Sequence, residues 1–133
     1  MDELKFAVIG NPVSHSLSPD IHLFFASQFQ LERYTYNKIK SNENDFERDI
    51  NDFFKNGGMG LNVTVPFKGL AYNLCDELDQ SAGLCKSVNT VLIDSGKLIG
   101  HSTDGQGLID DFLHKEITLE DSKILIIGAG GSA

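Results

Sequence analysis

The chain has 133 residues, of which 41% are hydrophobic and 23% charged, and its formal net charge is −8. This length and apolar content fit one folded domain with its own core, and they exclude a collagen, a coiled coil and a disordered tail. The basic residues form no cluster, which argues against a nucleic-acid partner or an anionic membrane surface. No apolar run exceeds four residues and the N-terminus is acidic, so we expect neither a membrane span nor a signal peptide, and hence a cytoplasmic protein.

The cysteines and histidines do not indicate a metal site or a disulfide framework. Cys75 and Cys85 are too few for such a framework and do not have the spacing of metal ligands. The four histidines share no such spacing either, so structural or exposed roles are expected for them. We therefore expect reduced cysteines and no metal cofactor.

Short apolar runs alternate with helical patterns along the chain. The apolar runs predict strands at residues 6–9, 34–39, 61–65, 88–93, 97–101 and 123–127. Helical patterns lie between them at residues 18–29, 44–54, 66–87 and 103–113. This alternation predicts an α/β fold with a mainly parallel twisted sheet and helices on both faces.

Several helix starts and one turn carry local signals. Ser18 followed by Pro19 is typical of an N-cap and a first helical residue. Asn44 and Thr103 each have a Glu or Gln three residues later, which predicts capping boxes. Asp94-Ser95-Gly96 predicts a hairpin turn between two strands. The last helix is expected to bury the apolar side chains of Leu108, Ile109, Phe112 and Leu113.

Two polar clusters in the first half of the chain follow predicted strands. Ligands of open α/β sheets bind beyond the carboxyl ends of the strands, so these clusters are candidate site residues. A loop with Ser16 and Ser18 leads into a helix N-terminus, which favours an anion such as a carboxylate. Asn62 and Thr64 share one face of a strand, and Lys68 lies in the first turn of the next helix.

Two further clusters follow in the second half. Asn89 interrupts an apolar strand, so its amide either bonds to backbone or faces a polar ligand. Asp104 lies in the first turn of a helix, next to Gly105 and Gly107, which favour close approach of a ligand or another backbone. Each of the four clusters alone has an ordinary structural explanation. Their shared position at one sheet edge favours a site for a small polyhydroxylated carboxylic acid.

The chain ends in a glycine cluster after an apolar strand. The match to the dinucleotide fingerprint is Gly128-x-Gly130-x-x-Ala133, in which glycines make a tight turn and let the backbone approach a pyrophosphate. No Gly-Lys-Ser/Thr follows, which argues against a phosphate-binding P-loop. We therefore expect residues 104–133 to be a linker helix, the first strand and the glycine-rich loop of a truncated Rossmann domain. Without its neighbours, that strand is expected to be frayed or paired with another copy.

Together, these motifs resemble the shikimate dehydrogenase family. The matching segments occur in the family's order and spacing: Ser16-Leu17-Ser18-Pro19, Asn62-Val63-Thr64-Val65-Pro66-Phe67-Lys68, Val88-Asn89-Thr90, Thr103-Asp104-Gly105 and Gly128-Ala129-Gly130-Gly131. The resemblance implies a shikimate-binding catalytic domain at residues 1–103, followed by the start of an NADP-binding domain. It also implies the NADP-dependent reversible reduction of 3-dehydroshikimate to shikimate, in aromatic amino-acid (chorismate) biosynthesis.

The resemblance further implies a role for each matched residue. Lys68 and Asp104 would form the catalytic pair. The substrate carboxylate and hydroxyls would be bound by Ser16, Ser18, Asn62, Thr64, Asn89 and Asp104. The cofactor diphosphate would lie against Gly128, Ala129, Gly130, Gly131 and Ser132. Ketone reduction builds negative charge on oxygen, which a nearby ammonium stabilises and can protonate, so Lys68 acts as proton donor or mainly as an electrostatic group.

Some features depart from the family or leave alternatives open. Ser87 stands where the family more often has Ala or Gly, and little effect is expected from it. Family chains are longer, so this chain alone is expected to bind shikimate weakly and not to catalyse hydride transfer. A quinate/shikimate dehydrogenase, or a non-catalytic binding module for a cyclic hydroxy acid, remains an alternative, and so does a homodimer.

Overall fold

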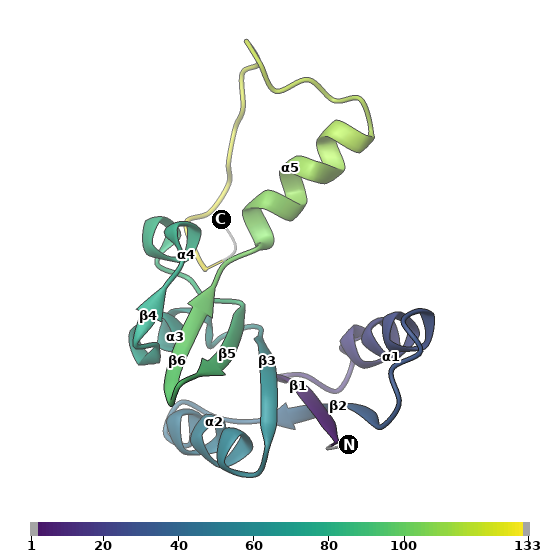
Figure 1. Cartoon of the computed structure of the whole chain (residues 1–133). Helices are drawn as coiled ribbons and strands as arrows, with labels where there is room; N and C mark the ends of the chain where they lie inside the picture. Colours follow the sequence, from purple (N-terminus) through teal and green to yellow (C-terminus); the bar gives the residue numbers. More distant parts are fainter. Residues whose placement is uncertain (1–2, 132–133) are drawn as a thin grey trace.

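A computed structural model describes residues 3–131 and shows one six-stranded sheet with five helices among them (Figure 1). The strands are β1 (Leu4–Gly10), β2 (Tyr34–Lys40), β3 (Gly58–Val63), β4 (Glu77–Leu78), β5 (Thr90–Asp94) and β6 (Lys97–His101). The helices are α1 (Ser18–Gln28), α2 (Phe46–Lys55), α3 (Lys68–Leu74), α4 (Gln80–Cys85) and α5 (Asp104–His114). None of these described helices is long and apolar enough to cross a membrane.

The sheet has the strand order β2-β1-β3-β5-β6-β4. β1 pairs in parallel with β2 and β3, and β4 pairs in parallel with β6. β5 runs antiparallel to both β3 and β6, and the β5–β6 hairpin turns at Ser95 and Gly96, which both have positive φ. The predicted α/β fold, mainly parallel sheet and hairpin are confirmed.

Alternate side chains of the strands build cores on both faces of the sheet. Ala7 and Ile9 of β1 pack with Ile50 of α2 in the larger core. Val8, the residue between them, packs with Tyr36 of β2 in a smaller core on the other face, where α1 lies. Successive side chains of β1 therefore point alternately into two separate apolar layers, and helices cover both faces as predicted.

Element boundaries near the site differ from those expected. β3 ends at Val63 rather than at residue 65, and α3 begins at Lys68 rather than at Pro66. Between them, the Val65–Pro66 peptide bond is cis and the Phe67 N–H donates to the Thr64 carbonyl at 3.0 Å. A turn therefore separates strand from helix. The short strand β4 was not predicted, because two residues carry no periodicity.

Within the described residues, none of the three expected side-chain caps forms. Ser18 lies inside α1, and its side chain bonds within the preceding loop. Asn42, rather than Asn44, accepts the backbone N–H groups that precede α2. Thr103 does lie at the N-cap of α5, but its hydroxyl accepts a hydrogen bond from Asn89 at 2.9 Å. Other contacts have displaced the local ones.

Helix α5 and the chain after it lie apart from the sheet until Gly131 returns beside Lys68 (Figure 1). The expected burial of the apolar side of α5 is wrong, because no residue within α5 is buried and Leu113 is 64% exposed. Residues 123–127 form no strand with any other described segment, and Ile124 and Ile127 are 65% and 91% exposed. The strand predicted at these residues is therefore not formed, because no described segment pairs with this apolar run.

Candidate functional site

The predicted site residues come together at one edge of the sheet. The carboxyl ends of β1 and β3 lie there, since these neighbouring strands run in parallel. β5 runs the opposite way, so its first residue, Thr90, lies beside Asn62 of β3 and His101 at the end of β6. Residues from four strands and from the starts of α1, α3 and α5 therefore meet in one region.

Lys68 and Asp104 form an ion pair across this edge. The Lys68 Nζ lies 2.6 Å from Asp104 Oδ2, although the two residues are 36 positions apart. The lysine side chain is only 13% exposed, whereas the aspartate is 43% exposed. A cation at the start of α3 faces the positive end of that helix, and the Asp104 carboxylate offsets this repulsion. The pair leaves Asp104 accessible and holds the ammonium close to the protein.

Asn89 holds the second oxygen of Asp104. Its Nδ2 donates to Asp104 Oδ1 and to Thr103 Oγ1, each at 2.9 Å. Its Oδ1 accepts from the Thr103 backbone N–H at 3.2 Å. Of the two alternatives left by the sequence, the bond to backbone is present, and Asn89 bonds in addition to two polar side chains of the site. Asp104, held at one oxygen by Lys68 and at the other by Asn89, has a fixed orientation.

The serine loop lies at the other end of the site. Ser16 Oγ donates to Ser18 Oγ at 3.1 Å, and the Ser18 backbone N–H donates back to Ser16 Oγ at 3.3 Å. Lys38 of β2, which sequence reasoning missed, donates from Nζ to the Ser14 carbonyl at 2.6 Å. The loop therefore combines two hydroxyls, the start of α1 and a nearby cation, an arrangement suited to a carboxylate.

Asn62 and Tyr36 connect the two ends of the site. The Tyr36 hydroxyl donates to Asn62 Oδ1 at 2.6 Å and also hydrogen bonds with Ser18. Burial of this ring raises the pKa of Tyr36, an effect that the bond to Ser18 only partly opposes. Sequence reasoning missed Tyr36 as a site residue. The available signal was its position on β2, because a tyrosine buried there needs a partner for its hydroxyl.

Thr64 lies beside this network rather than in it. Among residues 3–131, no hydrogen bond of its hydroxyl is found, and its methyl group packs against Gly10 at the end of β1. A Cβ at Gly10 would lie 2.4 Å from Thr64 Cγ2, so only glycine allows the two strands' ends to approach this closely. Gly10 is therefore a third residue of the site region that sequence reasoning missed, after Lys38 and Tyr36.

The glycine cluster lies next to Lys68. Ser87 Oγ donates to the Gly131 carbonyl at 2.7 Å, and Gly128 has a φ of +115° that favours glycine. A cavity of about 600 Å³ is lined by Val65, Pro66, Lys68, Gly69, Cys85, Lys86, Ala129, Gly130 and Gly131. The small residues of this loop fit the approach of a dinucleotide diphosphate to the cavity. Ser132, also expected at the cofactor, lies outside the described residues.

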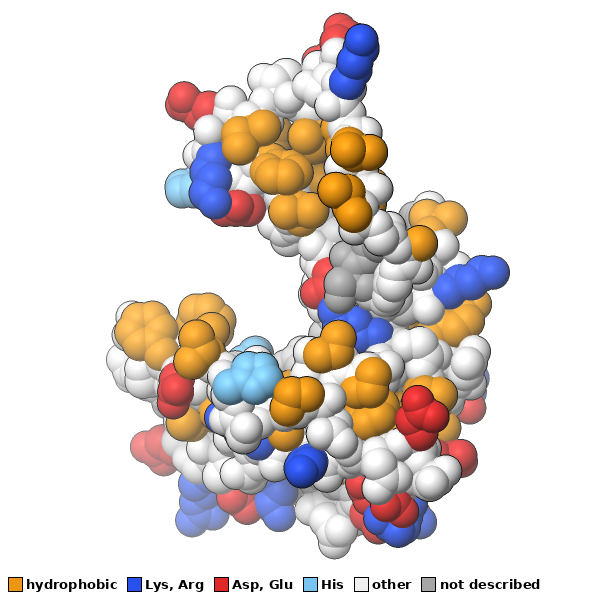
Figure 2. All heavy atoms as spheres, turned by 180° about the vertical axis from the view of Figure 1, so that it is seen from behind, with side chains coloured by type: hydrophobic (Ala, Val, Ile, Leu, Met, Phe, Trp, Pro, Cys, Tyr) orange, Lys and Arg blue, Asp and Glu red, His pale blue; other side chains and the backbone are white. Residues whose placement is uncertain are grey.

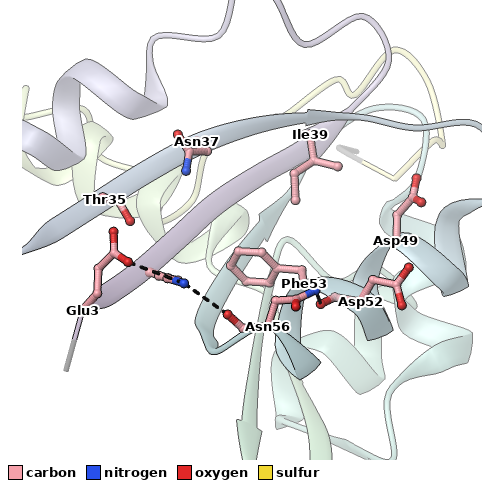
Figure 3. Close-up of a pocket in the computed structure, with 9 residues that line it drawn as sticks. Glu3, Thr35, Asn37, Ile39, Asp49, Asp52, Phe53 and Asn56 are labelled. Carbon is pink, nitrogen blue, oxygen red and sulfur yellow. Dashed lines mark hydrogen bonds and ion pairs between the residues drawn. The ribbon is translucent and has the colours of Figure 1, made fainter.

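A second cavity, of about 530 Å³, lies between β2 and α2 and contains none of the predicted site residues (Figure 3). Three of its lining residues contact one another, since Lys5 Nζ lies 3.5 Å from Glu3 and donates to the Asn56 carbonyl at 3.3 Å. The part of the chain that the structure describes holds no group of three or more His, Cys, Asp or Glu suited to a metal ion. The polar edge with the ion pair is therefore the candidate site.

The fold and this edge define a class: an α/β domain whose sheet edge combines a hydroxyl-rich loop, amides and an ammonium–carboxylate pair. A family model for the shikimate dehydrogenase substrate binding domain matches residues 8–91, and the chain belongs to this family. The resemblance stated from the motifs is confirmed.

Known relatives extend this similarity over nearly the whole chain. The chain is 44% identical over 128 residues to the shikimate dehydrogenase (NADP(+)) of Acinetobacter baylyi, covering 96% of this chain and 48% of that protein. A solved shikimate dehydrogenase in complex with NADP+ is 34% identical, with a TM-score of 0.91 over 98% of this chain and 45% of its own. The Thermus thermophilus enzyme in complex with shikimate is 33% identical, with a TM-score of 0.89 over 97% of this chain and 49% of its own. The chain thus spans about half the length of these relatives.

Proposed function

We propose that this chain is the shikimate-binding part of an NADP-dependent shikimate dehydrogenase, which reduces 3-dehydroshikimate reversibly to shikimate in the cytoplasm. The observation that carries the proposal is the Lys68–Asp104 pair, held by Asn89 in a polar edge that also contains the serine loop. Residues 1–103 form the substrate domain, and residues 104–133 begin the dinucleotide-binding domain.

The substrate is bound through groups of matching chemistry. The hydroxyls of Ser16 and Ser18 donate hydrogen bonds to the carboxylate at the start of α1, where the helix dipole favours negative charge. The ring hydroxyls are bound by Asn62, Thr64, Asn89 and Asp104. The amide N–H groups of Asn62 and Asn89 are engaged within the protein, so their oxygens and the Asp104 carboxylate offer acceptors, and the Thr64 hydroxyl can both donate and accept.

Lys68 supplies the proton of the reaction. When a hydride adds to the ketone carbon, the carbonyl oxygen gains negative charge, and the Lys68 ammonium stabilises and protonates it. Asp104 keeps the ammonium in place through the 2.6 Å contact. NADPH supplies the hydride when bound, and Gly128, Ala129, Gly130, Gly131 and Ser132 would hold its diphosphate. In the reverse direction, the neutral amine takes up the proton of the hydroxyl.

Two measurements test this function. Shikimate is titrated into the chain by calorimetry, and turnover is followed by loss of nicotinamide absorbance after the chain is joined to the dinucleotide-binding half of the Acinetobacter baylyi relative. Lys68→Ala should lower the turnover number by about 10²- to 10⁴-fold and change shikimate affinity much less. Lys55→Ala, at the far end of α2, is the matched control and should change neither.

Other outcomes would assign a different function. A chain that does not bind shikimate contradicts the proposal. A joined protein that binds shikimate without turnover, and in which Lys68→Ala lowers the affinity, contradicts it too, because this is the result expected of a sensor. Equal turnover with quinate would identify a quinate/shikimate dehydrogenase. The unjoined chain should bind shikimate weakly and should not reduce 3-dehydroshikimate.

A further inference from the structure

Tyr36 occupies a position between the two ends of the site. Its ring is 6% exposed and stacks on the His22 ring, with the centroids 4.4 Å apart. Its hydroxyl lies between Ser18 of the carboxylate loop and Asn62 Oδ1. The stack and the strand hold this hydroxyl at a fixed point, so its hydrogen bonds can orient the groups around it.

The orientation of the Asn62 amide follows from its neighbours. Nδ2 lies 3.1 Å from Thr90 Oγ1 and 3.4 Å from the Asn89 carbonyl oxygen. A carbonyl oxygen only accepts hydrogen bonds, so the NH₂ group must face it and the amide oxygen must face Tyr36. Tyr36 is then the donor, and its raised pKa keeps the phenol proton in place.

The hydrogen-bonding capacity that remains on Asn62 is one-sided. Both Nδ2 hydrogens are engaged within the protein, whereas Oδ1 has two lone pairs and Tyr36 uses one of them. In the network formed by residues 3–131, Asn62 can therefore offer a ligand only an acceptor. An O–H group satisfies this acceptor, whereas a keto or ether oxygen would meet another lone pair.

We infer that Tyr36 is a positioning and specificity-determining residue, which holds Asn62 as a pure acceptor so that the site takes a ring hydroxyl there and rejects a keto or ether oxygen. This inference rests on the proposed function. It has a consequence for the reaction, because the ketone of the substrate must then lie away from Asn62. The donor available to a ketone is the Lys68 ammonium, at the opposite end of the network.

The test compares Tyr36→Phe with Tyr34→Phe. Tyr34 lies on the same strand and stacks on Phe6, and its hydroxyl makes no hydrogen bond within the described part of the chain. Calorimetry measures binding of shikimate and of each of its monodeoxy analogues to the two variants and to the unmodified chain. Tyr36→Phe should weaken shikimate binding about tenfold, because Asn62 Oδ1 loses the donor that holds it toward the ligand hydroxyl. It should have little effect on one analogue, the one that lacks the hydroxyl bound by Asn62.

The outcomes separate this inference from the proposed function. If the unmodified chain does not bind shikimate, the proposed function fails. If the chain binds but Tyr36→Phe binds shikimate equally well, or loses affinity equally for every analogue, the positioning role is overturned. Should Tyr36→Phe not fold, NMR of the unmodified chain decides: the Asn62 side-chain N–H signals should keep their slow exchange when shikimate binds. If these N–H groups instead donate hydrogen bonds to shikimate, the inference is overturned.

Discussion

The most direct test of the site's geometry is a methyl group added at Gly10. A Cβ there would lie 2.4 Å from Thr64 Cγ2 and 3.2 Å from the Val65 carbonyl oxygen. Carbon atoms in contact lie about 3.5–4.0 Å apart, so Gly10→Ala requires a displacement of more than about 1 Å. The neighbours must give way because β1 and β3 are paired up to this point.

Either way of relieving this overlap moves the Thr64 hydroxyl. Rotation of the Thr64 side chain carries Oγ1 away with the methyl group. A backbone shift instead moves the Val65 carbonyl, which accepts the Asn11 N–H at 3.0 Å and so anchors the start of the serine loop. Overpacking of this kind should lower the free energy of unfolding by about 1–3 kcal/mol. Loss of one hydrogen bond to the ligand should weaken shikimate binding about fivefold.

Urea unfolding and calorimetric titration measure both effects, and Gly69→Ala is the control. Gly69 lies in α3 beside Lys68, and apart from its chain neighbours and its own helix backbone no described atom lies within 4 Å of a Cβ built there. Alanine at this helical position should leave affinity unchanged and raise stability by up to about 1 kcal/mol. A Gly10→Ala protein that unfolds and binds shikimate like the unmodified chain would refute the close approach of β1 to Thr64.

Two further predictions concern pH and the glycine cluster. Burial lowers the pKa of His22 from its ordinary value of 6.5, so the free energy of unfolding should be constant above that pH and decline as the pH falls from 6.5 to the lower folded-state value. His22→Phe, which keeps the ring stack on Tyr36, should reduce this decline in urea unfolding at pH 7.5 and 5.5; an unchanged decline contradicts the assignment. Ser87→Ala removes the donor to Gly131, so amide exchange of the glycine cluster should accelerate while shikimate affinity stays constant; unchanged exchange would show that this bond does not hold the loop.

The sequence was sufficient to predict which polar residues gather at one edge. Strand ends are readable from apolar runs, and parallel strands bring their carboxyl ends together, so Asn62 and Lys68 could be placed near one another. That Asp104 pairs with Lys68 was implied by the family resemblance, and the structure places the two side chains 2.6 Å apart. Spacing alone could not have shown it, because 36 residues and a hairpin separate the two.

Local sequence patterns could not predict which side chains of neighbouring elements contact one another. Thr103 and its Gln three residues later match a capping box, yet the hydroxyl bonds to Asn89 from another strand. Tyr36 and Gly10 matter through atoms on β3 and the turn after it, which no period along their own strand reveals. Local propensity describes one segment at a time, whereas these contacts depend on how segments pack.

The apolar face of α5 illustrates a related limit. Its helical period was read correctly, but the same period does not say what covers the face. Figure 2 shows apolar side chains gathered on α5 and on α1 on either side of a hollow, and Leu108 and Phe24 on these helices are 55% and 60% exposed. An amphipathic pattern therefore predicts a helix better than it predicts burial.

The charges of the site favour one orientation of a bound carboxylic acid. The chain carries a net charge of −8, so attraction for an anion must come from nearby groups rather than from the overall field, which salt screens within about 8 Å. Near Asp104, the carboxylate already neutralises the Lys68 ammonium, and a second carboxylate would be repelled. At the serine loop, the Lys38 ammonium forms no ion pair with an acidic side chain among residues 3–131, and it bonds instead to a backbone carbonyl. Under the proposed function, the substrate carboxylate would therefore lie at Ser16 and its ring oxygens toward Lys68, which is the orientation that ketone reduction at Lys68 requires.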